Sequence, residues 1–342
     1  MKAVAKLRPE SGALELIEIP APKPAAGEVL IHVGEAGICG TDISLWKWRE
    51  EVVAQYAPKF PLVLGHEFSG TVMTAGALVS EGAVVGINPQ VACRRCVYCY
   101  AGRPTLCRDR TLIGARVNGG WAEFVSVPEE NLFELPPGVD LSVLPVLEPL
   151  AVATHAVQER ARPVPGETVL IFGAGPIGLL TLVLALDAGV GAVYVADPDA
   201  SRLKSAAALG GIPIDVTSVD PVQVVRDNTF DGVDLVFETS GNHTVPAQAV
   251  ASARGGARIA LIGLAHSPAD LLTTPIVLKE LELIGSRGYN ESSWIQMMRV
   301  LPRIQTEVAG IITHRFPLEE FETALRLVAE GSDVGKVALI PA

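Results

Sequence analysis

Four of the five cysteines in the sequence lie in one short segment. They are Cys93, Cys96, Cys99 and Cys107. Four thiolates complete the tetrahedral shell of a zinc ion and leave no position for a substrate, so this spacing predicts a structural zinc site. Two disulfides, free thiols or an iron–sulfur cluster are the alternatives for the same cysteines.

A glycine-rich turn stands between a segment typical of a strand and a segment typical of a helix. Gly173, Gly175 and Gly178 form the pattern Gly-x-Gly-x-x-Gly. The first glycine permits a tight turn, the second lets the backbone approach a pyrophosphate, and the third lets helix and strand pack closely. The pattern therefore predicts a dinucleotide site.

An acidic residue is expected about 20 residues further on, at the end of the next strand, and Asp197 stands there. Its carboxylate would accept hydrogen bonds from the adenosine ribose and repel a 2′-phosphate, which predicts NAD rather than NADP. Arg202 is interpreted as a contact to adenine or ribose. The alternative is a glycine-rich turn of an unrelated α/β protein in which Asp197 caps a helix.

The fifth cysteine, Cys39, lies apart from the others, and a His-Glu pair (His66 and Glu67) and Glu148 occur later in the chain. One cysteine, one histidine and one carboxylate can form an open zinc site, whose fourth position binds water or substrate. Spacing alone does not join these residues. A buried cysteine and a structural His-Glu pair remain the alternatives at this point.

The motifs occur in a particular order: Gly-Ile-Cys39-Gly-Thr-Asp, Gly-His66-Glu67, the four-cysteine segment and Gly-Ala-Gly-Pro-Ile-Gly. In this order, and over essentially the whole chain, the sequence resembles the zinc-containing medium-chain dehydrogenase/reductase (alcohol dehydrogenase) family. The segment 148–151 (Glu-Pro-Leu-Ala) resembles the sorbitol (polyol) dehydrogenase branch. The segments 311–316 and 335–337 resemble both that branch and L-threonine 3-dehydrogenase.

The resemblance implies a catalytic zinc ion bound by Cys39 and His66, and Thr41 as acceptor of the hydrogen bond of the substrate hydroxyl. The third ligand is Glu148 or Glu67. Adjacent residues in an extended segment point to opposite faces, so we expect that His66 and Glu67 do not bind the metal together. We therefore favour Glu148 as the third ligand. Glu67 would either contact a ligand without binding the metal or exchange with one of the ligands.

The resemblance also implies contacts to NAD from residues in the second half of the chain. These residues are Ile177, Asp197, Arg202, Ile262, Gly263, Leu264, Ser286 and Arg287.

The implied activity is hydride transfer between NAD and a secondary alcohol of a polyol or sugar alcohol, giving a ketone, with two zinc ions per chain. The alternatives are an L-threonine 3-dehydrogenase or 2,3-butanediol-type dehydrogenase, or an inactive nucleotide-binding interaction protein with a zinc lobe. Two departures bear on the choice. Ser44 stands where many relatives carry histidine, which leaves the outer step of the proton path open. Gln90 stands where threonine dehydrogenases often carry histidine, which weakens the threonine alternative, whereas the loop at 46–56 has the length of the threonine type.

Two kinds of element must position these residues. Short strands with Gly and Pro turns fill residues 1–150, whereas strands alternate with helices over 151–294, among them a predicted helix at 179–188 and a predicted strand at 192–197. We therefore expect an α/β protein with a GroES-like β-rich catalytic domain (1–150 and 295–342) and a Rossmann domain (151–294). The latter would be a doubly wound parallel sheet that binds NAD. Residues 336–340 are expected to form a strand that returns to the first domain.

The composition limits the partners. The 342 residues include 27 Lys and Arg against 38 Asp and Glu, a net charge of −11. Nucleic acids and acidic membranes bind basic surfaces, so neither is expected as a partner. No signal peptide is recognisable, and we expect a cytoplasmic homodimer or homotetramer that acts on a small molecule.

Overall fold

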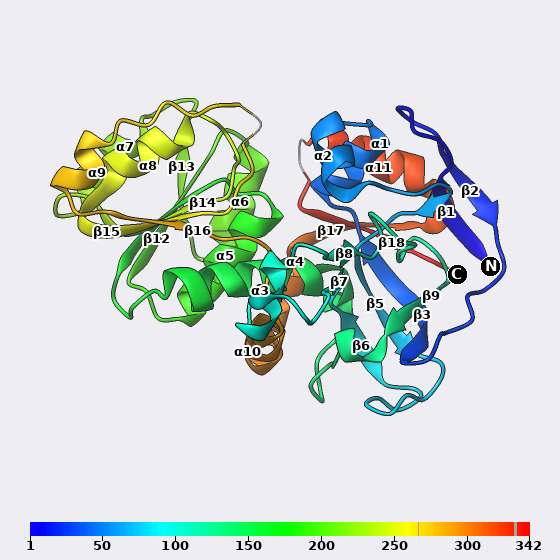
Figure 1. Cartoon of the computed structure of the whole chain (residues 1–342). Helices are drawn as coiled ribbons and strands as arrows, with labels where there is room; N and C mark the ends of the chain where they lie inside the picture. Colours follow the sequence, from blue (N-terminus) through cyan, green and yellow to red (C-terminus); the bar gives the residue numbers. More distant parts are fainter. Residues whose placement is uncertain (266, 332–333) are drawn as a thin grey trace. The chain divides into compact units, whose positions relative to one another are not determined.

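The computed structural model (Figure 1) describes residues 1–265, 267–331 and 334–342. Its internal contacts divide the chain into two compact units. The first contains Met1–Glu148, Met298–Gln305 and Ile312–Ala342, and the second contains Pro149–Met297 and Thr306–Ile311. The sequence predicted boundaries at 150 and 295, and the structure additionally assigns a short segment after 305 to the second unit.

The first unit is rich in short strands. Its strands are β1 (Lys2–Lys6), β2 (Leu14–Glu18), β3 (Glu28–Gly37), β4 (Leu62–Val63), β5 (Glu67–Val72), β6 (Val84–Ile87), β7 (Gln90–Val91), β8 (Thr111–Leu112), β9 (Phe124–Pro128), β10 (Leu132–Glu134), β17 (Ile312–Pro317) and β18 (Lys336–Ile340). Its helical segments are α1 (Gly40–Trp46), α2 (Glu50–Tyr56), α3 (Val97–Tyr100), α11 (Phe321–Glu330) and the 3₁₀ turns η1 (Pro104–Leu106), η2 (Glu129–Asn131), η3 (Leu141–Val146) and η5 (Leu318–Glu320).

The main sheet of this unit has the order β10-β6-β5-β3-β18-β17, and β9 also pairs with β3. Alternate residues of β3, among them Val29, Ile31 and Val33, are buried in the core, as expected of a strand with one face inside. The C-terminal strand β18 pairs antiparallel with β3. The sequence-based expectation that 336–340 return to the first domain is therefore confirmed.

The second unit alternates strands with helices. Its elements are the π-helical η4 (His155–Ala161), β11 (Thr168–Phe172), α5 (Pro176–Asp187), β12 (Ala192–Asp197), α6 (Ala200–Ala208), β13 (Ile212–Asp215), α7 (Pro221–Asn228), β14 (Val233–Glu238), α8 (Val245–Ser252), β15 (Ala253–Leu261), α9 (Thr274–Leu278) and β16 (Glu282–Gly285). The helices α4 (Leu147–Thr154) and α10 (Glu291–Ala309) have residues in both units.

These strands form a parallel sheet in the order β13-β12-β11-β14-β15-β16. The strand order reverses between β11 and β14, and the crevice outside the carboxyl ends of the strands at such a point is where ligands bind. The predicted parallel α/β fold is confirmed. The predicted helix 179–188 begins earlier, at Pro176, because proline is favoured at the first position of a helix.

One helical run, Leu141–Ala161, is long and apolar enough by composition to cross a membrane, and 78% of its most apolar window is buried inside the protein. Burial of this kind is typical of a core helix.

Candidate zinc and nucleotide sites

Three potential metal ligands meet in the first unit. Cys39 follows β3 and precedes α1, His66 lies in a bend before β5, and Glu67 is the first residue of β5. One ligand atom from each of the three residues lies within 4.8 Å of the others. A thiolate, an imidazole and a carboxylate at this separation fit the donor set of zinc.

The expectation that His66 and Glu67 point to opposite faces is wrong. Alternation requires an extended chain, but Gly65 has a φ of +91° and His66 lies in the bend that follows. The conformation of Gly65 is required, because a Cβ atom there would lie 2.1 Å from the buried Trp121 ring. The bend turns His66 toward the side on which the carboxylate of Glu67 lies.

Asp42, which was not among the site residues predicted from the sequence, contacts two of these residues. Its Oδ2 accepts a hydrogen bond from the Cys39 backbone N–H at 2.8 Å, and its Oδ1 lies 3.3 Å from Nδ1 of His66. Asp42 is completely buried. Burial lowers the pKa of His66, but the charges of Asp42 and Cys39 outweigh it and raise that pKa well above its usual value. The site therefore attracts positive charge, as a divalent cation site must.

Glu67 is paired with a cation of the protein. Its Oε2 accepts a hydrogen bond from Nζ of Lys336, the first residue of β18, and the two side chains are 3% and 4% exposed. Burial lowers the pKa of Lys336, but Glu67, Cys39 and Glu148 raise it, so that the pKa is above its usual value. The sequence analysis did not select Lys336 as a site residue.

Glu148 and Thr41 lie on helices. Glu148 is in the first turn of α4 and is half-buried, and Thr41 is in the first turn of α1 and is half-buried. Among the described residues, Glu148 lies outside the 4.8 Å group that Cys39, His66 and Glu67 form. Its charge nevertheless acts on Lys336, the partner of Glu67.

The structure brings the four-cysteine segment together. One sulfur atom from each of Cys93, Cys96, Cys99 and Cys107 lies within 4.8 Å of the others, and all are free thiols. The two-disulfide alternative is therefore wrong for this structure. Four converging sulfur atoms fit a closed tetrahedral zinc site.

The glycine turn of the second unit joins β11 to α5. A Cβ atom at Gly178 would lie 1.9 Å from the carbonyl oxygen of Gly173, so close packing of helix and strand requires glycine there. Gly173 has a φ of +97°, which permits the tight turn. Nothing lies within 4 Å of a Cβ atom placed on Gly175, so its backbone is open to a ligand.

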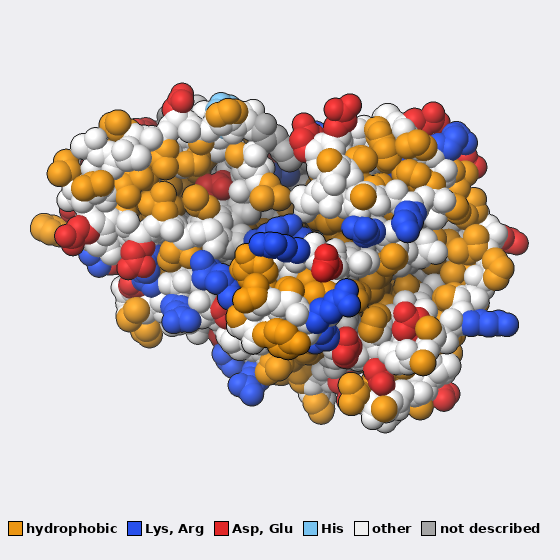
Figure 2. Space-filling model, viewed as in Figure 1, with side chains coloured by type: hydrophobic (Ala, Val, Ile, Leu, Met, Phe, Trp, Pro, Cys, Tyr) orange, Lys and Arg blue, Asp and Glu red, His pale blue; other side chains and the backbone are white. Residues whose placement is uncertain are grey.

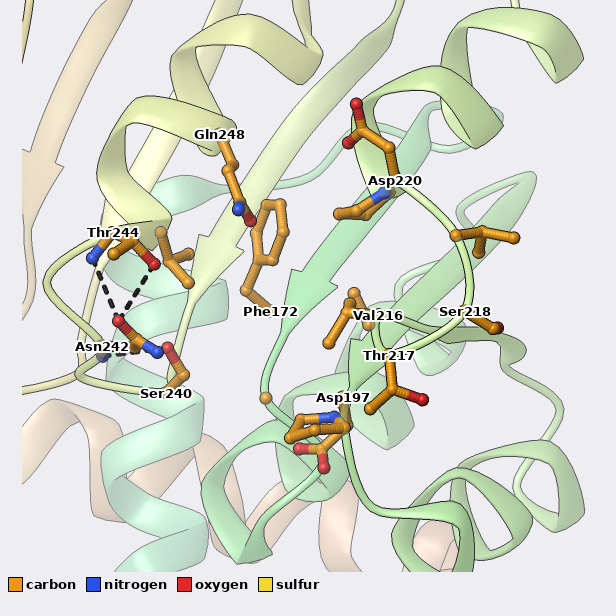
Figure 3. A pocket seen from close by; sticks show the side chains of 16 residues that line it. Phe172, Asp197, Val216, Thr217, Ser218, Asp220, Ser240, Asn242, Thr244 and Gln248 are labelled. Carbon is orange, nitrogen blue, oxygen red and sulfur yellow. Dashed lines mark hydrogen bonds between the residues drawn. The ribbon is translucent and has the colours of Figure 1, made fainter.

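A cavity of about 600 Å³ lies beside this turn, at the carboxyl ends of the strands (Figure 3). Asp197 lines it and is fixed by two backbone groups. Its Oδ2 accepts a hydrogen bond from Ala174 N–H at 2.8 Å, and its Oδ1 accepts one from Asp199 N–H at 2.8 Å. Arg202 lies in α6 and is half-buried, outside the set of described residues that line this cavity.

Several cavity residues were not predicted from the sequence. They are Val216, Thr217, Ser218, Asp220, Ser240, Asn242, Thr244 and Gln248, all labelled in Figure 3. They follow the carboxyl ends of β13 and β14, and the sequence analysis had not recognised β13. The rule that ligands bind outside these strand ends was the signal that could have found them.

The remaining predicted NAD contacts lie after β15 and β16. Ile262 and Gly263 donate their backbone N–H groups to the carbonyl oxygen of Glu238, and Leu264 is 77% exposed. Ser286 donates its N–H to the Leu261 carbonyl. Arg287 is exposed, and Ile177 is half-buried in the first turn of α5.

Comparisons with known proteins identify the family of the chain. A family model described as "Alcohol dehydrogenase GroES-like domain" matches residues 25–137, and one described as "Zinc-binding dehydrogenase" matches residues 176–303. L-threonine 3-dehydrogenase of Bacillus subtilis (strain 168) is 37% identical over 100% of this chain and 99% of its own length. The chain belongs to the zinc-containing medium-chain dehydrogenase/reductase family.

Solved structures of this family have the same fold. A protein described as a short chain alcohol dehydrogenase from E. coli CFT073, in complex with NADH, superposes with a TM-score of 0.91 at 28% identity and covers 99% of each chain. A 2R,3R-butanediol dehydrogenase from Bacillus subtilis superposes with a TM-score of 0.91 at 26% identity, covering 100% of this chain and 99% of its own. The chain is a zinc-dependent dehydrogenase, with a GroES-like and a Rossmann-like part.

Proposed function

We propose that this dehydrogenase oxidises the C3 hydroxyl of L-threonine with NAD as hydride acceptor. The products would be the 3-oxo amino acid, NADH and a proton. The observation that carries the proposal is the 37% identity over the full chain to the L-threonine 3-dehydrogenase of Bacillus subtilis. It outweighs the preference for a polyol, which rested on one tetrapeptide and on Gln90.

The residue roles follow from the two sites. Cys39, His66 and a carboxylate would hold the catalytic zinc ion, and the ion pair of Glu67 with Lys336 favours Glu148 as that carboxylate. Cys93, Cys96, Cys99 and Cys107 would hold the structural ion.

The cofactors supply the parts of the reaction that side chains cannot. When bound, zinc supplies Lewis-acid polarisation of the substrate oxygen and NAD supplies the hydride acceptor. Thr41 would accept the hydrogen bond of the substrate hydroxyl and begin the path by which its proton leaves. Asp42 would orient His66, and the charge of the fixed Asp197 would favour a ribose over its 2′-phosphate.

Residues of the nucleotide-binding unit would hold the cofactor. We assign these contacts to Gly173, Gly175, Ile177, Gly178, Asp197, Arg202, Ile262, Gly263, Leu264, Ser286 and Arg287. The open backbone at Gly175 and the cavity beside Asp197 support this assignment.

The test is NADH formation by the purified protein with L-threonine, 2,3-butanediol and sorbitol, each with NAD or NADP. We expect the highest kcat/KM with L-threonine and NAD, and loss of activity after treatment with a chelator. A higher kcat/KM for either diol or polyol would contradict the substrate proposal and leave the dehydrogenase assignment intact.

A vicinal-diol or polyol substrate is the second candidate. It is favoured by Gln90, by the segment 148–151 and by the superposition on 2R,3R-butanediol dehydrogenase.

Sedimentation of the purified protein would test the expected homodimer or homotetramer, and cell fractionation would test the expected cytoplasmic location.

A further inference from the structure

Lys336 is a buried cation next to a candidate site for a second cation. Its Nζ donates one hydrogen bond to the carbonyl oxygen of Ile38, at 3.1 Å, and another to Oε2 of Glu67. Ile38 immediately precedes the ligand Cys39. A positive charge near a divalent cation repels it and so does not favour its binding. The buried ammonium group of Lys336 therefore needs another explanation.

The backbone around Lys336 is fixed. The N–H of Ile38 donates to the carbonyl oxygen of Val337 at 2.9 Å, and β18 pairs with the end of β3. The side chain therefore extends from a strand that β3 and β17 hold on both sides.

Gly37 of β3 also limits where the carboxylate of Glu67 can lie. Gly37 is its register partner across β3 and β5, and a Cβ atom at Gly37 would lie 2.5 Å from Oε2 of Glu67. Only glycine leaves room for the carboxylate in the position where Lys336 binds it. Both residues thus serve one placement of Glu67.

We propose that Lys336 is a positioning residue that keeps the Glu67 carboxylate away from the cation bound at Cys39 and His66. Without Lys336, the buried Glu67 would lack its counter-charge, and its nearest alternative would be that cation, because the ligand atoms lie within 4.8 Å of one another. A further carboxylate ligand would occupy the position that a substrate oxygen requires. The inference rests on the catalytic cation of the proposed function, not on the identity of the substrate.

The test replaces the catalytic cation with Co²⁺, whose visible absorption reports the number and type of its ligands. Wild type, Lys336→Met, Lys336→Arg and the double variant Lys336→Met/Glu67→Gln are titrated with imidazole as a small added ligand. We expect the wild type and Lys336→Arg to change spectrum on titration. Lys336→Met should show an extra ligand before titration, respond at least about 10-fold more weakly, and lose about 10–100-fold in kcat/KM.

The double variant separates a positioning role from a purely structural one. It removes the ammonium group and the charge that competes for the cation, so it leaves no buried charge unpaired and should recover the imidazole response. If Lys336→Met does not fold, the double variant still tests the proposal. Retention of Co²⁺ with the wild-type response supports the proposal, and loss of Co²⁺ shows that Glu67 is itself a required ligand and overturns it.

Lys6 offers a matched control. It is the other buried lysine of the first unit, completely buried, and its Nζ donates to the carbonyl oxygens of Glu10 and Gly12. Lys6→Met should lower stability and leave the Co²⁺ spectrum unchanged. A wild-type imidazole response in Lys336→Met would overturn the proposal. Binding of only one metal ion by the wild type would overturn the proposed catalytic site as well.

Discussion

Asp42 connects two ligand residues of the candidate catalytic site through one buried carboxylate. It accepts a hydrogen bond from Cys39 N–H and lies 3.3 Å from Nδ1 of His66. Asp42→Asn keeps the shape and removes the charge that orients the imidazole and favours a cation nearby. We expect a loss of about 10–100-fold in affinity for the catalytic zinc ion, because partners of metal ligands commonly contribute that much.

The measurement is zinc per chain against chelator concentration, with Asp199→Asn as control. Asp199 caps α6 in the other unit, where its carboxylate accepts hydrogen bonds from the backbone N–H groups of Ser201 and Arg202. The control should retain both zinc ions at the chelator concentration that removes one from Asp42→Asn. Equal retention by the two variants would contradict the role of Asp42.

The ion pair of Lys336 with Glu67 marks the limit of prediction at this scale. Cys39 and His66 were selected because their motifs, in their order along the chain, resemble those of the family. Lys336 is 269 residues from Glu67 in the sequence, and only the pairing of β18 with β3 brings it close. Residue type carries no signal of that pairing.

The turn between β11 and α5 shows how one element separates a packing requirement from a binding requirement. Gly178→Ala would place a Cβ atom 1.9 Å from the Gly173 carbonyl oxygen, whereas Gly175→Ala would meet no atom within 4 Å. We expect Gly178→Ala to lower the free energy of unfolding by about 2–4 kcal/mol, and Gly175→Ala to change it by less than about 0.5 kcal/mol.

NAD binding should distinguish Gly175→Ala from the wild type. Because the backbone of Gly175 faces open space, an added methyl group there would obstruct the pyrophosphate, so the Kd for NAD should rise at least about 10-fold in a stable protein. Chemical denaturation and NAD titration by fluorescence measure the two effects. Wild-type NAD affinity in Gly175→Ala would show that the pyrophosphate does not approach this turn.

Glu159 joins two helical elements of the second unit, η4 and α10. It accepts hydrogen bonds from the hydroxyls of Ser292 and Ser293, and it lies 2.9 Å from Nδ1 of His155. Burial raises the pKa of Glu159, but these groups outweigh it and lower the pKa to about 2 from the ordinary 4.5. The ionised carboxylate therefore stabilises the folded state.

The sign of the pH dependence follows from that lowered pKa. The stabilisation is complete above about pH 4.5 and is lost as the pH falls from there toward 2. Glu159→Gln should lower the free energy of unfolding by about 2 kcal/mol near pH 7, and its difference from wild type should shrink below about pH 4.5. Urea unfolding at several pH values measures this, and a difference independent of pH would contradict it.

The elements themselves were predicted unevenly. Strand β12 coincides with its predicted bounds, since an apolar run bounded by glycine and an acidic residue is a clear pattern. Strand β13 (Ile212–Asp215) was missed, because it is short and contains Pro213, which is unusual inside a strand. The segment Trp46–Tyr56 was interpreted as a loop, whereas Glu50–Tyr56 form α2, a helix with no buried residue and hence no apolar stripe.

The whole chain combines a candidate zinc site and a candidate nucleotide site, and its amino-acid composition predicts neither of them. Its net charge of −11 argued against nucleic acids, and in Figure 2 basic and acidic side chains are interspersed on the visible face. The fold class could be predicted because periodicity and glycine spacing are local properties. The convergence of Glu67 with Cys39 and His66 could not, because it depends on a bend at His66 and on the pairing of distant strands.

The four-cysteine cluster predicts how stability and zinc content change when a structural metal ion is lost. The ligand atoms of Cys107 and its three partners lie within 4.8 Å of one another, and Cys107 is 6% exposed. Cys107→Ser would open this shell, so we expect zinc to fall from about two to about one ion per chain and the unfolding midpoint to fall by about 5–15 °C. NAD affinity should remain within about twofold, because the nucleotide turn lies in the other unit.

Cys39→Ser is the matched comparison, because it removes one thiolate from the other candidate site. It should also reduce zinc to about one ion per chain, with loss of NADH formation, because the open site is the one that would bind the substrate oxygen. Elemental analysis, thermal unfolding and NAD titration of the two variants give the three quantities. Two zinc ions in Cys107→Ser would contradict a closed metal site at this cluster.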